Sequence, residues 1–422
     1  MTLLAFAASQ FGMAQSTLRL SLSEAQQYAE EHNYTLQNAS LEVQNAEANR
    51  WQTISTMLPQ VSAGFDYQNM LGYELEFAGT GMKIPMNPNG TLNIQAAVAV
   101  TGQQIVGTQL NKMAIEMADI SKKKNIQTIR ANVKSSYTSI LVMEETVVLL
   151  DSSMANMERL LKTTQDAVDA GAAEQISADK LSVQVASMRN SITSTRRTLN
   201  VLYNSLLLQL GADVNTHLEL TTTVEELLNI NEISQLGQRQ FDIEKNYDYQ
   251  LLKENEQLSK KQITLAWMNI TPTISAYYQY SYKTYFGKAS GMNMTPPNVV
   301  GISISQPIFK SGNVAAQVKS ARIAYQETLN SKQQAEDGLN VQYNQLCYDL
   351  ASAIDSYTTQ KDNLDVTKRV FDNTLEKFKY GMATNIDVTN SSTDIITAQS
   401  NYIQAVLSVV NAEVALENMM SR

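Results

Sequence analysis

The segment LPQVSAGFDYQ at residues 58–68 returns, in altered form, as TPTISAYYQYS at residues 271–281. A proline stands at the same place in both copies, at Pro59 and Pro272, and apolar side chains then alternate with small or polar ones. Alternation with a period of two is typical of a strand with one apolar face. We therefore expect a strand after each proline. The spacing of about half the chain indicates one large duplicated unit rather than a short repeat.

Further matches follow in the same order along both halves of the chain. Asn33-Tyr34 corresponds to Asn246-Tyr247, and Gly171 corresponds to Gly381. The apolar, uncharged start of the chain is typical of the end of a secretory signal. The expected organisation is a signal peptide remnant at 1–14, a first repeat at 15–213 with strands near 60–70 and 93–106, and a second repeat at 214–422 with strands near 273–283 and 298–307.

Proline separates strand-forming from helix-forming segments. All seven prolines lie between residues 59 and 88 or between 272 and 307. Outside these windows, apolar residues recur in steps of three and four, as in Ile140, Met143, Val147, Leu150 and Met154. This period predicts long helices that pack as coiled coils. Because Gly171 and Gly381 each lie between a long helix and its return, we expect one helical hairpin per repeat.

Composition excludes several classes of function. The net charge of −9 and the pI near 5.0 argue against a nucleic-acid partner, which requires a basic surface. A single cysteine, Cys347, cannot form an internal disulfide. The two histidines, His32 and His217, lie in unrelated contexts, and we find no metal-ligand spacing, nucleophile motif or phosphate loop. We therefore expect neither an enzyme nor a bound cofactor or metal.

Four strands with one apolar face leave two interpretations open. They form a soluble β-domain with an aromatic core, or they lie in a membrane. In a membrane they cannot close on themselves, and an open sheet edge is not tolerated in lipid. Oligomerisation solves this problem, since two chains supply eight strands and three supply twelve. Only the larger barrel leaves a lumen.

Three sequence features together resemble the outer membrane efflux proteins, the TolC-like family. They are Leu58-Pro59 at the first strand, Gln306-Pro307-Ile308-Phe309 at the end of the last strand, and Tyr380-Gly381 followed by Ile386-Asp387-Val388. The resemblance covers nearly the whole mature chain, duplication included. It implies a mainly α protein with membrane β, in which each chain gives four strands to a trimeric 12-stranded barrel. Long helical hairpins then continue the barrel as an α-barrel tunnel.

The resemblance also implies a function and partners. The chain is expected to be a passive exit duct of a tripartite efflux or type I secretion system. Its expected location is the outer membrane of a Gram-negative bacterium, in contact with outer membrane lipid and extending into the periplasm. The implied partners are two further copies in a homotrimer, a periplasmic adaptor and an inner-membrane transporter. The alternative is a secreted α-helical pore-forming toxin or a coiled-coil structural protein.

Three groups of residues are the expected functional sites. The resemblance places the pore constriction at Asp387, Asn390 and Ser177, although Asn390 and Ser177 stand where other members carry aspartate. We expect adaptor docking at the hairpin tips and a strand-to-helix junction near the prolines. For Asp387 a second interpretation stays open, in which it caps the last helix. The tip residues are Gly171, Ala172, Tyr380, Gly381 and Met382, and the junction residues are Pro59, Pro272, Gln306 and Pro307.

Overall fold

The computed structural model describes residues 17–421 except for 77–78, 80, 82 and 287–295. The expected signal peptide remnant at 1–14 lies outside the described residues. The chain forms two compact units. We call Leu41–Ile120 with Leu251–Gln334 the strand unit, and Met1–Ser40 with Ser121–Gln250 and Ala335–Arg422 the hairpin unit. Both repeats contribute to both units, so the compact units differ from the division into 15–213 and 214–422.

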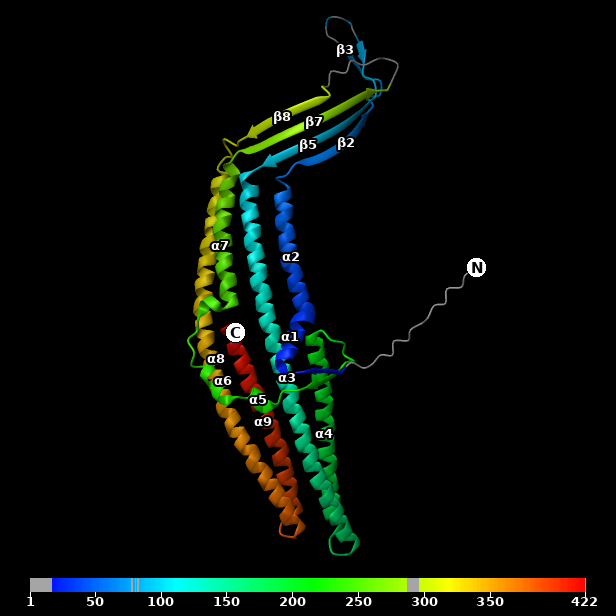
Figure 1. Cartoon of the computed structure of the whole chain (residues 1–422), viewed down its shortest axis with the longest axis vertical. Coiled ribbons are helices and arrows are strands. Elements are labelled where there is room, and N and C mark those ends of the chain that lie inside the picture. Colours follow the sequence, from blue (N-terminus) through cyan, green and yellow to red (C-terminus); the bar gives the residue numbers. More distant parts are fainter. Residues whose placement is uncertain (1–16, 77–78, 80, 82, 287–295, 422) are drawn as a thin grey trace, which may run out of the picture. The chain divides into compact units, whose positions relative to one another are not determined.

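The strand unit contains one antiparallel four-stranded sheet in the order β2-β5-β7-β8 (Figure 1). The strands span Gln60–Gln68, Asn89–Val100, Thr273–Tyr285 and Asn298–Ser305. The four expected strands are therefore confirmed, but the expected end of the second strand at residue 106 is wrong. Thr101 and Gln104 each accept a hydrogen bond from the other's backbone N–H, at 3.1 and 2.9 Å. This capping box starts a helix at Gly102 and so ends the strand.

The sheet has one continuous apolar face. Val61 pairs with Ala96, Ala96 with Tyr278, and Tyr278 with Val300, and the alternate rows repeat this arrangement. Cross-strand partners project from the same face, so the expected alternation is confirmed across all four strands. Tyr277 breaks the pattern on the opposite, polar face. Gly301 lies opposite it, and a Cβ on Gly301 would come within 2.5 Å of the Tyr277 ring, so the ring covers the glycine.

Four helix ends adjoin the sheet within the strand unit, and side-chain hydrogen bonds join them in series. Gln104 Nε2 donates to Thr56 Oγ1 at 3.1 Å, and Gln103 Nε2 donates to Asn269 Oδ1 at 2.6 Å. Asn269 Nδ2 then donates to Gln317 Oε1 at 2.8 Å. The helices and the short turn involved are α2 (Tyr34–Ser55), α3 (Gly102–Asp169), α7 (Tyr247–Trp267), η2 (Met268–Ile270) and α8 (Asn313–Lys379).

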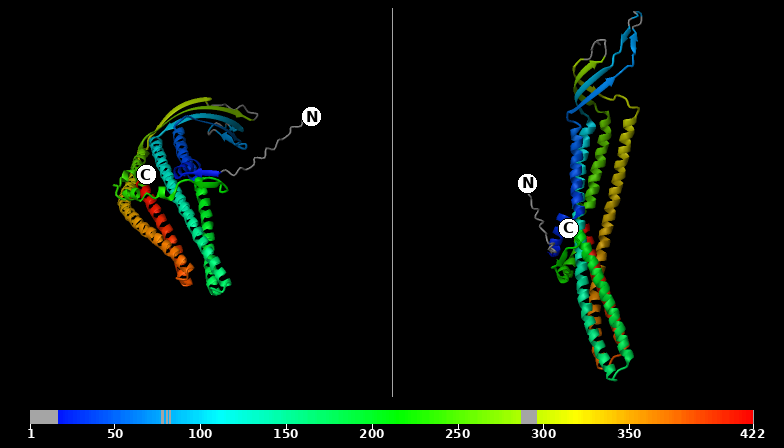
Figure 2. Two further views of the ribbon diagram at one scale, coloured as in Figure 1. Left: turned by 60° about the horizontal axis from the view of Figure 1, so that its bottom comes forward. Right: turned by 90° about the vertical axis from the view of Figure 1, so that its right-hand side faces the viewer.

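The hairpin unit contains both expected helical hairpins, α3 with α4 (Gln175–Leu210) and α8 with α9 (Asn385–Met419). Their turns lie at the same end of the unit (Figure 2). A large core, which includes Tyr137, Leu206, Leu350 and Val409, packs all four helices together. The hydroxyl of the fully buried Tyr137 donates to Leu20 O at 2.9 Å and so anchors the short strand β1 (Thr17–Leu20).

Sequence reasoning missed several short elements. The strand β1 pairs in parallel with β6 (His217–Leu220), and β3 (Glu74–Glu76) pairs with β4 (Lys83–Pro85). These strands are three or four residues long, too short to show a period in the sequence. The short helices are α1 (Leu22–His32), α5 (Val224–Leu227), α6 (Ile230–Leu236) and η1 (Ile243–Lys245).

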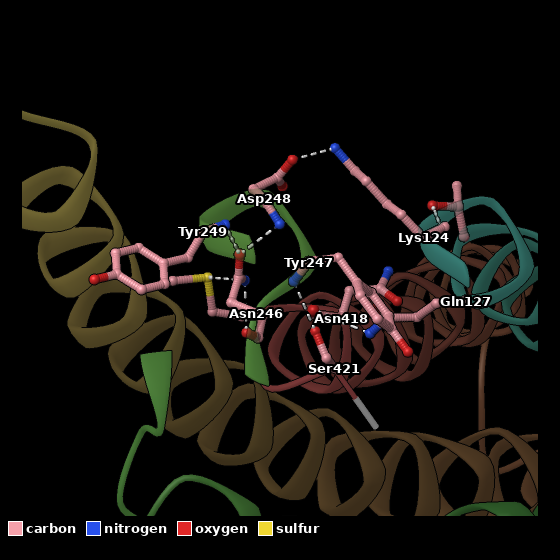
Figure 3. A network of polar contacts seen from close by, with 10 residues as sticks. Lys124, Gln127, Asn246, Tyr247, Asp248, Tyr249, Asn418 and Ser421 are labelled. Carbon is pink, nitrogen blue, oxygen red and sulfur yellow. Dashed lines mark hydrogen bonds and ion pairs between the residues drawn. The ribbon is translucent and has the colours of Figure 1, made fainter. Parts of the chain in front are cut away.

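A buried asparagine performs the same role in both repeats. Asn246 accepts hydrogen bonds from the first N–H groups of α7 and donates to Met419 O at 2.9 Å, at the end of α9 (Figure 3). Asn33 accepts from Thr35 N at 2.8 Å at the start of α2 and donates to Gln209 O at 2.6 Å near the end of α4. Each asparagine thus caps one helix and fastens it to the last helix of its own repeat.

The next feature is the length and hydropathy of the helices in the described part of the chain, measured against the needs of a membrane span. None of them is both long and apolar enough to cross a membrane.

Candidate functional site

The two hairpin tips have the same backbone turn. Gly171 and Gly381 adopt the left-handed conformation, with φ of +75° and +71°. The residue after each glycine donates its N–H back across the turn, from Ala172 to Ala167 O and from Met382 to Lys377 O, at 2.8 Å in both cases. The glycine N–H groups bond to Val168 O and Phe378 O at 2.9 Å. This pair of bonds is the Schellman motif, which ends a helix and requires a left-handed residue at the position of the glycine.

The start of α9 carries a reciprocal cap. Thr384 donates its backbone N–H and its hydroxyl to the Asp387 carboxylate at 2.7 and 2.6 Å. In return, Asp387 N donates to Thr384 Oγ1 at 3.2 Å. These hydrogen bonds from the Thr384 side chain and backbone hold the pKa of the Asp387 carboxyl below its usual value. The carboxylate is therefore ionised at neutral pH, and it is held at a helix start where the helix dipole favours a negative charge.

The start of α4 lacks this cap. Glu174 occupies the position of Thr384, and its side chain makes no capping hydrogen bond. Ser177 occupies the position of Asp387, and its N–H bonds to Glu174 O at 3.0 Å. The second tip therefore carries a fixed carboxylate at a position where the first carries an uncharged hydroxyl.

A small core lies behind the tips and joins the two hairpins. Met157, Phe371 and Val388 are fully buried in it, and Leu181 is 2% exposed. These four residues come from α3, α8, α9 and α4, so each of the four hairpin helices contributes to the cluster. Displacement of either tip would therefore disturb the packing of the other.

The turns present apolar side chains to solvent. Tyr380 is 64% exposed and Met382 is 69% exposed, and adaptor docking at these residues stays a prediction. Sequence reasoning did not include Ile176 and Ile386, which are 54% and 63% exposed and occupy matching positions in the two repeats. The sequence signal for them is the isoleucine that stands directly before Ser177 and directly before Asp387.

The three expected constriction residues are not joined to one another. Asp387 and Asn390 are exposed and Ser177 is half-buried. In the part of the chain that the structure describes, the Asp387 side chain forms hydrogen bonds only with Thr384. The second interpretation of Asp387, as a helix cap, is therefore what the geometry displays. The Asp387 carboxylate stays exposed while it caps α9, so the capping role is compatible with a position that faces a pore.

The expected junction residues lie where strands meet helices in the strand unit. Pro59 and Pro272 directly precede the first residues of β2 and β7, where the missing N–H of proline costs no ladder bond. Gln306 and Pro307 directly follow β8. A linker then leads to α8, and Ser311 and Gly312 in it have positive φ.

The described residues contain no group of three or more histidine, cysteine, aspartate or glutamate side chains suited to a metal ion. The tips present exposed apolar side chains and one carboxylate that hydrogen bonds hold in place.

Comparison with solved structures identifies the fold. The fold matches that of the Campylobacter jejuni CmeC outer membrane channel with a TM-score of 0.74 and 13% identity. The match covers 95% of this chain and 85% of that chain. The outer-membrane channel OprN matches over 95% of this chain and 89% of its own, with a TM-score of 0.73 and 14% identity. The fold is that of the outer membrane channels with a helical tunnel.

Sequence comparison finds a family match over the second part of the chain. Residues 244–422 match the family model described as outer membrane efflux protein. The outer membrane efflux protein BepC of Brucella suis biovar 1 (strain 1330) is 24% identical over 123 residues, which is 29% of this chain. The aligned region spans 27% of BepC. Residues 244–422 are therefore similar to the outer membrane efflux proteins, and the chain as a whole has the fold of outer membrane channels.

Proposed function

We propose that three copies of this chain form the exit duct of a tripartite efflux system. The observation that carries the proposal is the sheet of the strand unit, which has one apolar face, one polar face and two unpaired edges. Val300 and Ile302 on the apolar face are 77% and 76% exposed in the single chain. Exposed apolar area of this kind is suited to lipid, while the opposite face suits a water-filled lumen.

The direction of the edge strands supports closure by other copies. The order β2-β5-β7-β8 is antiparallel throughout, so β2 and β8 run in opposite directions. The β8 edge of one copy can therefore pair with the β2 edge of the next in the antiparallel manner that continues the sheet. Three copies give about twelve strands, a barrel wide enough for a lumen, whereas the interior of an eight-stranded barrel is filled by side chains.

The hairpin tips are proposed to receive a periplasmic adaptor, and an inner-membrane transporter is proposed to drive transport. Exposed Tyr380 and Met382, together with glycine turns that carry no side chain, offer an apolar surface that another helical hairpin can approach. The duct itself is passive in this proposal. Type I secretion would use the same surfaces with a protein as cargo.

The secreted toxin or coiled-coil structural protein receives no specific support. A toxin has no need of a preformed sheet with two complementary edges in each chain. The family model that matches residues 244–422 and the fold shared with outer membrane channels both favour the duct.

The test is the mass of the particle. Light scattering of the purified protein in detergent is expected to give three chains per particle. One or two chains would overturn the duct. In a strain that lacks the chain, accumulation of a fluorescent efflux substrate should rise and return to normal when the chain is supplied.

A further inference from the structure

The helix segments next to the sheet carry only positive charge. The four segments are 50–58, 101–115, 257–272 and 306–322, and none of them contains Asp or Glu. The chain as a whole has more acidic than basic residues, so this distribution departs from its composition. We call the basic residues of these segments the cationic collar: Arg50, Lys112, Lys260, Lys261, Lys310, Lys319 and Arg322.

The collar residues lie at a similar depth from the strands. Hydrogen bonds join the four helix ends in series, from Thr56 through Gln104 and from Gln103 through Asn269 to Gln317. Lys112 lies ten residues after the start of α3, which is about 15 Å along the helix axis. Lys319 lies six residues after the start of α8, or about 9 Å. Because lysine and arginine side chains are long, their charged groups can reach a common depth despite this difference along the helix axes.

The collar charges are accessible. Arg50, Lys112, Lys260, Lys319 and Arg322 are all exposed. Two contacts engage members of the set: Lys112 lies 3.6 Å from Glu116, and Lys310 Nζ donates to Asn269 O at 2.9 Å, which leaves its charge uncompensated.

Three of the cations also share a groove between α3 and α7. Lys112, Lys260 and Lys261 line it together with the Glu116 carboxylate, Met113, the amides of Gln109 and Gln257, and the hydroxyl of Thr264. Three ammonium groups against one carboxylate leave the groove with a net positive charge, which together with the neutral donors suits an anion that carries several oxygen atoms.

Exposed aromatic and apolar side chains lie between the collar and the strands. The two tryptophans of the chain are both here, at Trp51 near the end of α2 and Trp267 at the end of α7, and they are 61% and 43% exposed. Ile308 and Phe309, just after β8, are 98% and 84% exposed. Tryptophan gathers at the boundary between hydrocarbon and water, and lysine and arginine gather just beyond it.

We propose that the cationic collar binds the anionic phospholipid headgroups of the leaflet from which the helices emerge. This inference rests on the proposed membrane wall formed by the sheet. The order from strand to helix is an apolar face, then exposed tryptophans, then segments that contain basic and no acidic residues. Clusters of four to eight Lys and Arg beside a membrane segment bind anionic lipid through this combination of depth and charge. The groove between α3 and α7 is the place for one phosphate group.

The two tryptophans provide the readout. The purified wild-type protein is reconstituted in bilayers that contain either brominated phosphatidylcholine or brominated phosphatidylglycerol, and bromine quenches the indole groups of Trp51 and Trp267 on contact. We expect phosphatidylglycerol to be preferred by about fivefold for a lipid that touches one collar cation. The preference should weaken at about 1 M salt, where the screening length is short.

A charge-matched pair of variants separates the collar from general charge. The collar variant changes Lys112, Lys260, Lys261, Lys319 and Arg322 to Gln, and leaves Lys310 because of its bond to Asn269. The control variant changes five exposed cations of the hairpin unit to Gln: Lys162, Lys180, Arg197, Lys368 and Arg369. The preference should fall to about one in the collar variant and persist in the control.

Each failure has a different signature. Equal quenching by both lipids in the wild type overturns the collar and leaves the membrane wall intact. Absence of quenching by either lipid overturns the membrane wall itself. Loss of the preference in both variants alike would assign it to net charge and also overturn the collar.

Discussion

The two hairpin tips have the same backbone and different charge. Both turns use a left-handed glycine and the same pair of returning hydrogen bonds, with matching distances. The helix that follows the first turn starts without a side-chain cap at Glu174, whereas the second starts with the Thr384–Asp387 capping box. The repeat is therefore accurate in geometry and divergent in electrostatics.

This difference separates what a turn requires from what a helix start can vary. A left-handed residue is costly for any side chain with a Cβ, so glycine is fixed by the turn itself. A helix start tolerates a poor cap at a cost of about 1 kcal/mol, which the packing behind the tip can offset. The shared core of Met157, Leu181, Phe371 and Val388 supplies that packing to both hairpins.

The largest expected effect comes from removing the feature that the tips share. Gly171→Val and Gly381→Val should each strain the turn by about 1–2 kcal/mol, because a β-branched residue is poorly tolerated at positive φ. Nothing lies within 4 Å of a Cβ at either site, so the two effects should be equal. Hydrogen exchange of the last helical turns in the purified protein should accelerate by about 5- to 30-fold in both variants.

Asparagine is the matched control, since it accepts the left-handed conformation. Gly381→Asn should exchange almost as slowly as the wild type. Gly381→Glu tests the docking proposal further, because a bulky charge enters the exposed turn. It should abolish efflux while the oligomer and its membrane location persist. Normal efflux by Gly381→Glu would refute adaptor docking at this tip.

The repeated residues of the sequence predicted the architecture because each one has a local physical role. Pro59 and Pro272 mark the residue before a strand, and Gly171 and Gly381 mark left-handed turns. The match of Asn33 with Asn246 was visible in the sequence. Its meaning was not, because the partner carbonyls of Gln209 and Met419 lie far along the chain.

The misplaced end of the second strand has a different cause. Ile105 and Val106 lie shortly after Val100, and β-branched residues favour strands. The reciprocal hydrogen bonds of Thr101 and Gln104 start a helix here instead of extending the strand. The Thr-x-x-Gln pattern in the sequence is the signal of this helix start. Surface roles such as docking could not be derived in this way, because they depend on partners rather than on the chain's own contacts.

A smaller effect is expected when the capping difference between the tips is tested. Thr384→Ala should loosen the first turn of α9 by about 1 kcal/mol, because it removes an N-cap side chain. Glu174→Ala should leave the first turn of α4 unchanged, since its side chain makes no cap bond. Hydrogen exchange of the two helix starts in one sample measures both effects. Equal responses would mean that packing, not capping, holds both starts.

The reverse exchange sharpens the same test. Glu174→Thr combined with Ser177→Asp places the missing capping box at the start of α4, at the positions that correspond to Thr384 and Asp387. Exchange of the first turn of α4 should then slow to the rate found in α9. If hydrogen exchange of this turn does not slow, the backbones of the two helix starts differ even though the two turns before them are alike.

The smallest effect concerns the charge of Asp387. The Thr384 hydrogen bonds lower its pKa, so its capping contribution is complete above the ordinary carboxyl pKa and is lost as the pH falls through the lowered value. Three such carboxylates in a trimer would make the pore favour cations, and that preference should persist in acid to below pH ~4, the ordinary pKa of aspartate. Single-channel reversal potentials at decreasing pH measure it.

Two variants test whether this pH dependence comes from Asp387. Thr384→Ala removes the hydrogen bonds that lower the pKa, so the cation preference should disappear at a higher pH than in the wild type. Asp387→Asn should lower the preference at every pH and remove the titration. Since Thr384→Ala leaves the carboxylate in place, a shifted midpoint can come only from the pKa of Asp387. If all three proteins have the same selectivity at each pH, the carboxylate does not face the pore, and Asp387 serves only to start α9.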